Sequence, residues 1–194
     1  MANNPDIELH PFTPWIPQEA KVLIMGTFPP QKKRWAMEFY YPNRTNDFWK
    51  IMGLLFMGNA EALVDKANKS YNLERIKELL TEKGIAMSDT GHAVKRLKDN
   101  ASDKFLEIVE PVDLDSILEK IPMCRAVCTT GEKASQVVAM LTSTEAPKMG
   151  EYTNTPSGLE LWRMPSTSRA YPLALEKKAE YYANMFRHIG LLPN

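Results

Sequence analysis

The chain has 194 residues, of which 44% are hydrophobic and 25% are charged, ordinary values for a globular protein. This composition excludes an intrinsically disordered chain, and with only two cysteines, Cys124 and Cys128, it also excludes a disulfide-stapled mini-protein. Lysine and arginine total 24, as do aspartate and glutamate, so the net charge is zero and any contact with nucleic acid must rest on a local basic patch.

Membrane and metal chemistry are disfavoured by the same sequence. The longest apolar stretches, such as residues 22–25 and 54–57, are far shorter than the roughly 20 residues of a membrane span. The first residues lack the basic start and apolar core of a signal peptide, so we expect no membrane partner and a cytoplasmic location. The three histidines and two cysteines form no recognisable ligand set for zinc or an iron–sulfur cluster. We expect no metal and no cofactor.

Four short apolar segments alternate with longer amphipathic ones. The apolar segments predict strands at residues 21–25, 85–88, 125–128 and 159–164. Apolar residues at spacings of three and four predict helices over residues 48–56, 73–80, 114–121, 134–141 and 175–189. This alternation is typical of an α/β fold with a central, mostly parallel, four-stranded sheet covered by helices on both faces. We expect one domain over residues 1–194 that acts as a monomer.

In such folds the ligand site lies at the carboxyl ends of the strands, which directs attention to the loops that follow them. The loop after the first strand joins a glycine, a hydroxyl, aromatic rings and cations. Its candidate residues are Gly26, Thr27, Phe28, Lys32, Lys33, Arg34, Phe39 and Tyr41. Glycine lets the backbone approach a ligand closely, and aromatic faces beside cations suit a nucleotide. The alternative is that the aromatics are core residues and the cations lie in a solvated loop.

The loop after the last strand carries three hydroxyls and an arginine, namely Ser166, Thr167, Ser168 and Arg169. Hydroxyls and backbone amides at a strand end can hold phosphate oxygens, with the arginine as a charge-assisted contact. The alternative is that serine and threonine after Pro165 simply form a turn.

Taken in order, the motifs KVLIMGTFPP, FYYPN, NDFW, GIAMSDT, VCTTGEKA and MPSTSRA resemble the uracil-DNA glycosylase superfamily over roughly residues 21–189. The mismatch-specific uracil glycosylases and the hypoxanthine-DNA glycosylases are the most similar branches. The resemblance implies a three-layer α/β/α sandwich and a DNA-repair enzyme that cleaves the bond between a deaminated base and deoxyribose, without a metal.

The first motif departs from the usual pattern of the superfamily, which places an aspartate or asparagine between Gly-x and Pro to position water. Phe28 stands there and cannot orient water by hydrogen bonding. In the hypoxanthine branch the asparagine of Asn-x-Phe-Trp takes that role, which the resemblance assigns to Asn46 as the catalytic residue. Asn43 is a rival because the spacing from Pro42 is longer than usual, and capping of the helix is the alternative role of Asn46.

The resemblance also distributes the remaining roles. Phe39 is the candidate stacking face for the flipped base, with Tyr41 second, and Gly26, Thr27 and Phe28 supply further base contacts. The loop at residues 166–169 matches the segment that grips and pushes on the DNA strand, and Lys32, Lys33 and Arg34 add a local basic patch. The rival function, favoured by Phe28, is a glycosylase-like scaffold that binds nucleic acid without catalysis.

Three further residues lie near the expected site. Asp89 follows the second strand, where it can orient a backbone turn in the floor of the pocket, and a catalytic role is not assigned to it. His92 is interpreted as a surface-loop histidine, and the alternative is a role as an acid or in binding phosphate. Residues 96–103 resemble an exposed turn before a helix at Phe105.

Overall fold

A five-stranded sheet forms the centre of the protein in a computed structural model that describes residues 6–98 and 102–194. Its strand order is β5-β2-β8-β10-β9, with β2 spanning Val22–Gly26, β5 Ile85–Asp89, β8 Ala126–Thr130, β9 Tyr152–Asn154 and β10 Glu160–Met164. The first four strands are mutually parallel, and they are the four predicted from the apolar segments. The fifth strand, β9, pairs antiparallel with β10 at the sheet edge, so the prediction of a four-stranded sheet was wrong by one strand.

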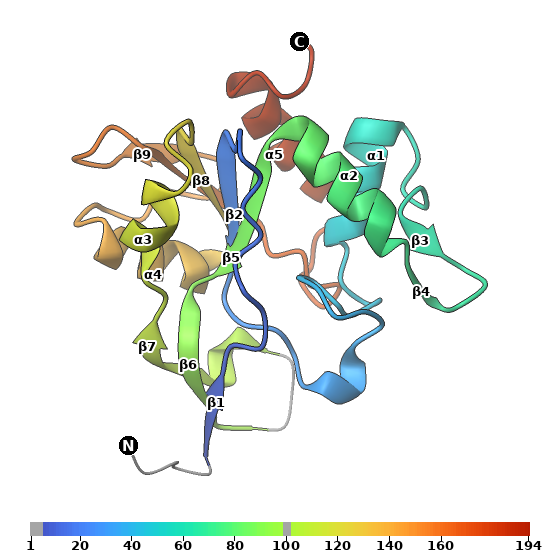
Figure 1. Ribbon diagram of the computed structural model, residues 1–194, viewed down its shortest axis with the longest axis horizontal. Coiled ribbons are helices and arrows are strands. Elements are labelled where there is room, and N and C mark those ends of the chain that lie inside the picture. Colours follow the sequence, from blue (N-terminus) through green and yellow to red (C-terminus); the bar gives the residue numbers. More distant parts are fainter. Residues whose placement is uncertain (1–5, 99–101) are drawn as a thin grey trace.

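Five α-helices flank this sheet in the described residues. They are α1 (Phe48–Met57), α2 (Leu73–Lys83), α3 (Leu114–Glu119), α4 (Glu132–Leu141) and α5 (Leu175–His188). Figure 1 shows α1 and α2 to the right of β2 and β5, and α3 and α4 to the left of these two strands.

Alternate residues of the strands feed two separate hydrophobic cores. Val22 and Ile24 of β2 join the core that contains the buried faces of α1, α2 and α5. Leu23 and Met25 point to the opposite face, into the core that contains α3 and α4. Because both faces of the strands are covered, the strands are apolar along their whole length, which is the pattern that made them recognisable in the sequence.

The helix boundaries follow local chemistry. The Asn72 side chain accepts a hydrogen bond from the Arg75 N–H and caps α2, and Gly84 ends that helix in a left-handed conformation. Gly58 ends α1 in the same way. These stops fix where β5 begins, one residue after Gly84, and therefore where its carboxyl end lies.

A second, antiparallel sheet lies beyond the end of β5. It has the order β1-β6-β7, with β1 at Ile7–Leu9, β6 at Gly91–Arg96 and β7 at Leu106–Pro111. Figure 1 shows it below the central sheet. The expected helix at Phe105 is wrong, because only a short 3-10 turn (Asp103–Phe105) precedes β7; of the predicted exposed turn, residues 99–101 lie outside the described residues.

Two smaller elements complete the architecture. A two-stranded hairpin pairs β3 (Val64–Asp65) with β4 (Ser70–Tyr71), and a 3-10 turn, η1, spans Lys32–Arg34.

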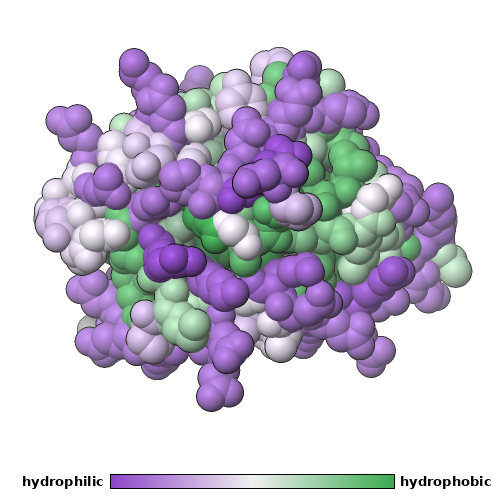
Figure 2. All heavy atoms as spheres, turned by 90° about the horizontal axis from the view of Figure 1, so that it is seen from above, coloured by the Kyte–Doolittle hydropathy of each residue, from purple (hydrophilic) through white to green (hydrophobic). Residues whose placement is uncertain are grey.

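Seen from above, one end of the molecule has a band of hydrophobic residues between hydrophilic ones (Figure 2). Among the described residues, none of the helices has both the length and the apolar character needed to cross a bilayer.

Candidate functional site

A cavity of about 1320 Å³ lies at the carboxyl ends of β2, β5, β8 and β10. It is the place that the parallel-sheet rule indicates, because the loops after these strands converge there. Ten of the residues proposed from the sequence line it: Gly26, Thr27, Phe28, Arg34, Tyr41, Asn46, Ser166, Thr167, Ser168 and Arg169. The rival asparagine, Asn43, lines it as well.

The floor of the cavity, which we define as Gly26, Tyr41, Asp89 and Thr130, is closely packed and polar. A Cβ atom on Gly26 would lie 2.7 Å from Asp89 Oδ1 and 3.1 Å from Tyr41 Oη. The absence of that side chain is therefore what allows the carboxylate and the phenol to approach the end of β2. Tyr41 Oη forms a hydrogen bond of 2.7 Å with Thr130 Oγ1.

The side chain of His10 binds the carboxylate of Asp89, one of the residues of the floor. His10 Nε2 lies 2.9 Å from Asp89 Oδ2, and both side chains are only 8% exposed. The other ring nitrogen, Nδ1, contacts the Phe12 backbone. Burial alone would lower the pKa of His10, but the hydrogen bond to Asp89, the charge of Asp89 and the Phe12 carbonyl together raise this pKa above its usual value. The pair therefore favours an imidazolium beside a carboxylate.

Tyr41 occupies an unusual backbone conformation at the same place. Its φ of 51° is in the left-handed region, which non-glycine residues seldom adopt. Its ring stacks on Phe48, with centroids 4.0 Å apart and an interplanar angle of 18°. Burial, followed by the charge of Asp89, raises the pKa of Tyr41 well above its usual value, so the phenol keeps its proton.

A second carboxyl group, that of Asp103, reaches the cavity from the turn before β7. Thr27 Oγ1 donates a hydrogen bond of 2.9 Å to Asp103 Oδ2. Lys133 of α4 secures this turn by donating to the backbone carbonyls of Asp103, at 2.9 Å, and Leu106. Burial is the largest cause that raises the pKa of Asp103, and the nearby charge of Asp89 acts in the same direction.

The wall of the cavity, which we define as Asn46 together with residues 166–169, is built where α1 begins. Asn46 Oδ1 accepts a hydrogen bond of 2.9 Å from the Phe48 N–H, which fixes the side chain at the helix start. Asn46 and Ser168 form an antiparallel β-bridge, and the Asp47 N–H donates to the Thr167 carbonyl at 2.8 Å. Asn43 Oδ1 instead accepts from Thr45 N and Oγ1, both at 3.0 Å.

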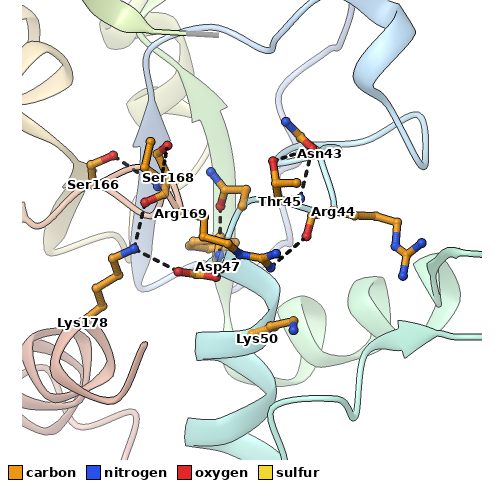
Figure 3. Close-up of polar contacts among 12 residues, drawn as sticks. Asn43, Arg44, Thr45, Asp47, Lys50, Ser166, Ser168, Arg169 and Lys178 are labelled. Carbon is orange, nitrogen blue, oxygen red and sulfur yellow. Dashed lines mark hydrogen bonds and ion pairs between the residues drawn. The ribbon is translucent and has the colours of Figure 1, made fainter. Parts of the chain in front are cut away.

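A buried lysine, Lys178, stabilises the position of the wall. Lys178 of α5 is fully buried, and its Nζ lies 2.9 Å from Asp47 Oδ2 and 2.8 Å from the Ser168 carbonyl oxygen. Figure 3 shows Lys178 directed at both groups, so that α5, the start of α1 and the last loop meet at one ammonium group. Arg169 closes the other side of Asp47, with Nε 3.5 Å from Oδ1, and also donates to the Arg44 carbonyl.

Three of the proposed residues lie away from the cavity. Phe39 is 6% exposed and packs against Trp15, Tyr40 and Trp49 in the core, so its ring cannot stack on a base in this structure. This corrects the expected stacking role, and the alternative that the ring is a core residue describes Phe39 better. Lys32 and Lys33 also lie outside the cavity lining, and Lys32 forms an exposed ion pair of 3.0 Å with Glu38.

Phe28, by contrast, is half-buried and faces the cavity. Its ring meets His10 edge to face, with centroids 5.2 Å apart, and the Arg96 guanidinium lies 6.0 Å from the ring centre. Arg96 is itself paired with Glu8 at 2.9 Å. Phe28 therefore contributes an aromatic surface to a cavity lined by both polar and apolar residues.

The cavity carries more positive than negative side chains, although the chain as a whole is neutral. Among the described residues that line it, five are cations and three are acids: Arg34, Arg96, Lys104, Lys133 and Arg169 against Asp89, Asp103 and Glu132. Arg96 and Arg169 have acidic partners outside the lining, Glu8 and Asp47. The other three cations therefore carry most of the positive charge that can attract a polyanion to this face. The sequence predicted only Arg34 and Arg169 of these cations, because the others come from elements whose placement depends on the tertiary fold. His92 is exposed, as expected, but it lies in strand β6 and not in a loop.

Two known proteins are similar to this chain, one in sequence and one in fold. Over 171 residues the chain is 25% identical to a hypoxanthine DNA glycosylase of Methanosarcina acetivorans, which covers 88% of this chain and 93% of that protein. The fold is similar to the solution NMR structure of a candidate uracil DNA glycosylase from Methanosarcina acetivorans. The TM-score is 0.64 at 23% sequence identity, over 94% of this chain and 98% of that one. No protein-family model matches the chain. Together the likenesses support a relationship to the uracil-DNA glycosylase superfamily and confirm the resemblance drawn from the motifs.

Proposed function

We propose that this protein is a DNA glycosylase that hydrolyses the N-glycosidic bond of a deaminated base, hypoxanthine or uracil, in DNA. We propose further that it acts as a monomer, without a cofactor. The observation that carries the proposal is the position of Asn46, which is fixed at the start of α1, bridged to Ser168 and part of the lining of the cavity. The names of the two relatives support the same reaction class.

Asn46 has the capacity to act on both water and base. Its Oδ1 accepts one hydrogen bond from Phe48 N, and a carbonyl oxygen has a second lone pair that can accept from a water molecule. No partner of Asn46 Nδ2 is found within residues 6–98 and 102–194, so this amide can donate to a carbonyl oxygen of the base. The hydrogen bond from Phe48 N thus orients the Asn46 side chain, and it leaves the second lone pair of Oδ1 and the amide group available to a ligand.

The remaining residues of the cavity suit a flipped nucleotide. Extruding a base costs a few kcal/mol of stacking, which contacts inside the pocket must replace. Phe28 takes the stacking role first given to Phe39, because its ring lines the cavity. Backbone groups and hydroxyls of residues 166–169 would hold phosphate oxygens on the flanking strand, with Arg169 as the charge-assisted contact.

Bond cleavage passes through a sugar with oxocarbenium character while the base leaves with negative charge. The Asn46 amide, aimed at the base, would stabilise that charge as preorganised donors do elsewhere, where loss of one donor costs a factor of about 10² to 10³ in rate. The carboxyl groups of Asp89 and Asp103 line the same cavity as Asn46.

The decisive experiment is cleavage of labelled oligonucleotides that carry deoxyuridine or deoxyinosine, single-stranded and in each mispair, followed by alkali to reveal abasic sites. We expect Asn46→Ala to lower the single-turnover rate by about 10²- to 10³-fold. The helix should lose only about 0.5–2 kcal/mol of capping free energy, so the variant should still fold.

Asn43→Ala is the matched control. Asn43 lines the same cavity but its Oδ1 is bonded to Thr45, and we expect a much smaller loss of activity than for Asn46→Ala. A loss confined to Asn43→Ala would move the catalytic role to Asn43. Folded wild-type protein that binds DNA but cleaves neither lesion would contradict the proposal and favour a non-catalytic scaffold, for which Phe28 in the water-positioning place of the motif is the specific argument.

A further inference from the structure

We propose that Asp89 and Tyr41 recognise the lactam edge of the extruded base, that is, a ring N–H next to a carbonyl group. The inference deepens the proposed glycosylase function and rests on it. It gives Asp89 a direct contact with the base and thereby makes this residue a determinant of specificity.

The first argument is the free oxygen of Asp89. Its Oδ2 is taken by His10 Nε2 at 2.9 Å, whereas no hydrogen-bond partner of Oδ1 is found in the described part of the chain. Oδ1 lies at the end of β2, within 2.7 Å of the point where a Gly26 Cβ would be. Asp89 is 7% exposed and lines the cavity, so a ligand there can supply a donor to this oxygen.

His10 determines both the orientation and the charge of this acceptor. The hydrogen bond to Oδ2 and the backbone contacts of Nδ1 leave the carboxylate with one fixed direction, in which Oδ1 faces Gly26. When His10 is protonated, the pair of His10 and Asp89 carries no net charge. Recognition by the carboxylate therefore adds no net negative charge opposite a base that leaves as an anion.

Tyr41 supplies the complementary donor. Its hydroxyl oxygen lies 3.1 Å from the same Gly26 Cβ position, so the two side chains border one small space. In the 2.7 Å contact with Thr130 either hydroxyl can be the donor. When Thr130 donates, the Tyr41 hydrogen is free to donate to a carbonyl oxygen of the base.

A hydrogen-bond acceptor next to a donor is complementary to a lactam, which presents a donor N–H next to an acceptor carbonyl. Hypoxanthine offers N1–H and O6, and uracil offers N3–H and O4, so each can pair with Asp89 and Tyr41 at once. Adenine presents the opposite pattern, an N1 acceptor beside an amino donor. The lone pair of its N1 would face the carboxylate oxygen of Asp89, and two acceptors repel each other. A site built to pair a polar group rejects an analogue that leaves the group unpaired more strongly than an apolar pocket rejects a change of size.

The test compares deoxyinosine with deoxynebularine, which lacks both the N1–H and the 6-oxo group, in the same oligonucleotide. The wild-type protein should cleave deoxyinosine faster. In Asp89→Asn the amide can still accept from His10 through Oδ1 and can donate to an N1 acceptor. We expect the ratio of the two single-turnover rates to fall by about 10- to 100-fold.

Asp103→Asn is the matched control, because it removes the charge of the other carboxyl group in the cavity. It should change both rates by a common factor and leave their ratio unaltered, since Asp103 is bonded to Thr27 rather than directed at Gly26. Gly26→Ala serves as a second variant, because its Cβ would displace the Asp89 carboxylate and should lower the ratio with Asp89 intact.

Each outcome decides the matter. A lower ratio in Asp89→Asn but not in Asp103→Asn supports the inference. Equal cleavage of the two substrates by wild-type protein overturns it, as does an unchanged ratio in folded Asp89→Asn; if that variant does not fold, an unchanged ratio in Gly26→Ala overturns it. Wild-type protein that cleaves no deaminated base refutes the proposed function, and the inference falls with it.

Discussion

A buried pair of opposite charges supports each of the wall and the floor of the cavity, Asp47 with Lys178 (the wall pair) and Asp89 with His10 (the floor pair), and the two pairs differ in how completely they are satisfied. In the wall pair, both oxygens of Asp47 are engaged, one by Lys178 at 2.9 Å and the other by Arg169 at 3.5 Å. In the floor pair, the described residues engage only one oxygen of Asp89, and its partner is the titratable His10. The difference shows that one pair holds the chain together whereas the other leaves an acceptor open toward the cavity.

The largest effect should come from breaking the wall pair. Lys178→Met leaves the Asp47 carboxylate buried without its main partner, and such losses typically destabilise a protein by about 3–5 kcal/mol. Thermal or urea unfolding monitored by circular dichroism measures this change. Asp47→Asn in the Lys178→Met background should restore part of the loss, because it removes the uncompensated charge.

The neighbouring lysine is the control for that measurement. Lys177 forms an exposed ion pair with Glu180, so Lys177→Met should change the free energy of unfolding by no more than about 0.5 kcal/mol. Equal effects at positions 177 and 178 would contradict a structural role for the buried pair.

The floor pair should make stability depend on pH. Because the folded-state pKa of His10 is raised above the usual value of 6.5, the pair stabilises the fold fully below that value. The contribution is lost as the pH rises through the folded-state pKa, and each unit of raised pKa corresponds to about 1.4 kcal/mol. The difference in melting temperature between wild type and His10→Gln should therefore shrink from acid to alkaline pH.

His92 provides the comparison for this titration, since its side chain is exposed. His92→Gln should follow the wild-type curve across the same range. A His10→Gln difference that does not vary with pH would show that the imidazole contributes by packing alone.

The smallest effect is expected at the exposed edge of the wall. Arg169 is 51% exposed, so Arg169→Gln should cost less than about 1 kcal/mol of stability. If Arg169 contacts a phosphate, the variant should bind all DNA sequences more weakly and reduce the slope of log affinity against log salt by about one. An unaltered slope in a fluorescence-anisotropy titration would remove Arg169 from the DNA contacts.

The central strands and helices could be predicted because they are encoded locally. Strands buried on both faces, such as β2, are apolar along their length, and helices such as α2 carry an apolar stripe with a capping residue and a terminal glycine. The edge strand β9 has only three residues and none is buried, so it leaves no comparable pattern. The loops after the predicted strands therefore located the cavity correctly. The number of strands in the sheet could not be predicted in the same way.

The partners within the site could not be predicted, because they join distant positions. His10 and Asp89 are 79 residues apart, Thr27 and Asp103 are 76 apart, and Asp47 and Lys178 are 131 apart. Only Lys178 leaves a signal, since it lies on the apolar stripe of α5 between Leu175 and Tyr182, where a charged residue needs a buried partner.

Phe39 illustrates the opposite error. Its neighbours in sequence, Tyr40 and Tyr41, have identical aromatic character, and no local rule says which of three consecutive rings faces a cavity. The structure resolves this through the left-handed backbone of Tyr41, which sends that residue to the floor while Phe39 and Tyr40 enter the core.

That backbone conformation has a consequence for how the sequence can change. A non-glycine residue held in the left-handed region costs about 1–2 kcal/mol, and glycine would remove the cost. Glycine would also remove the phenol and the ring stacked on Phe48. Because the loss of this packed ring costs more stability than the relief of backbone strain returns, the packing of the fold and the chemistry of the floor both favour tyrosine at position 41.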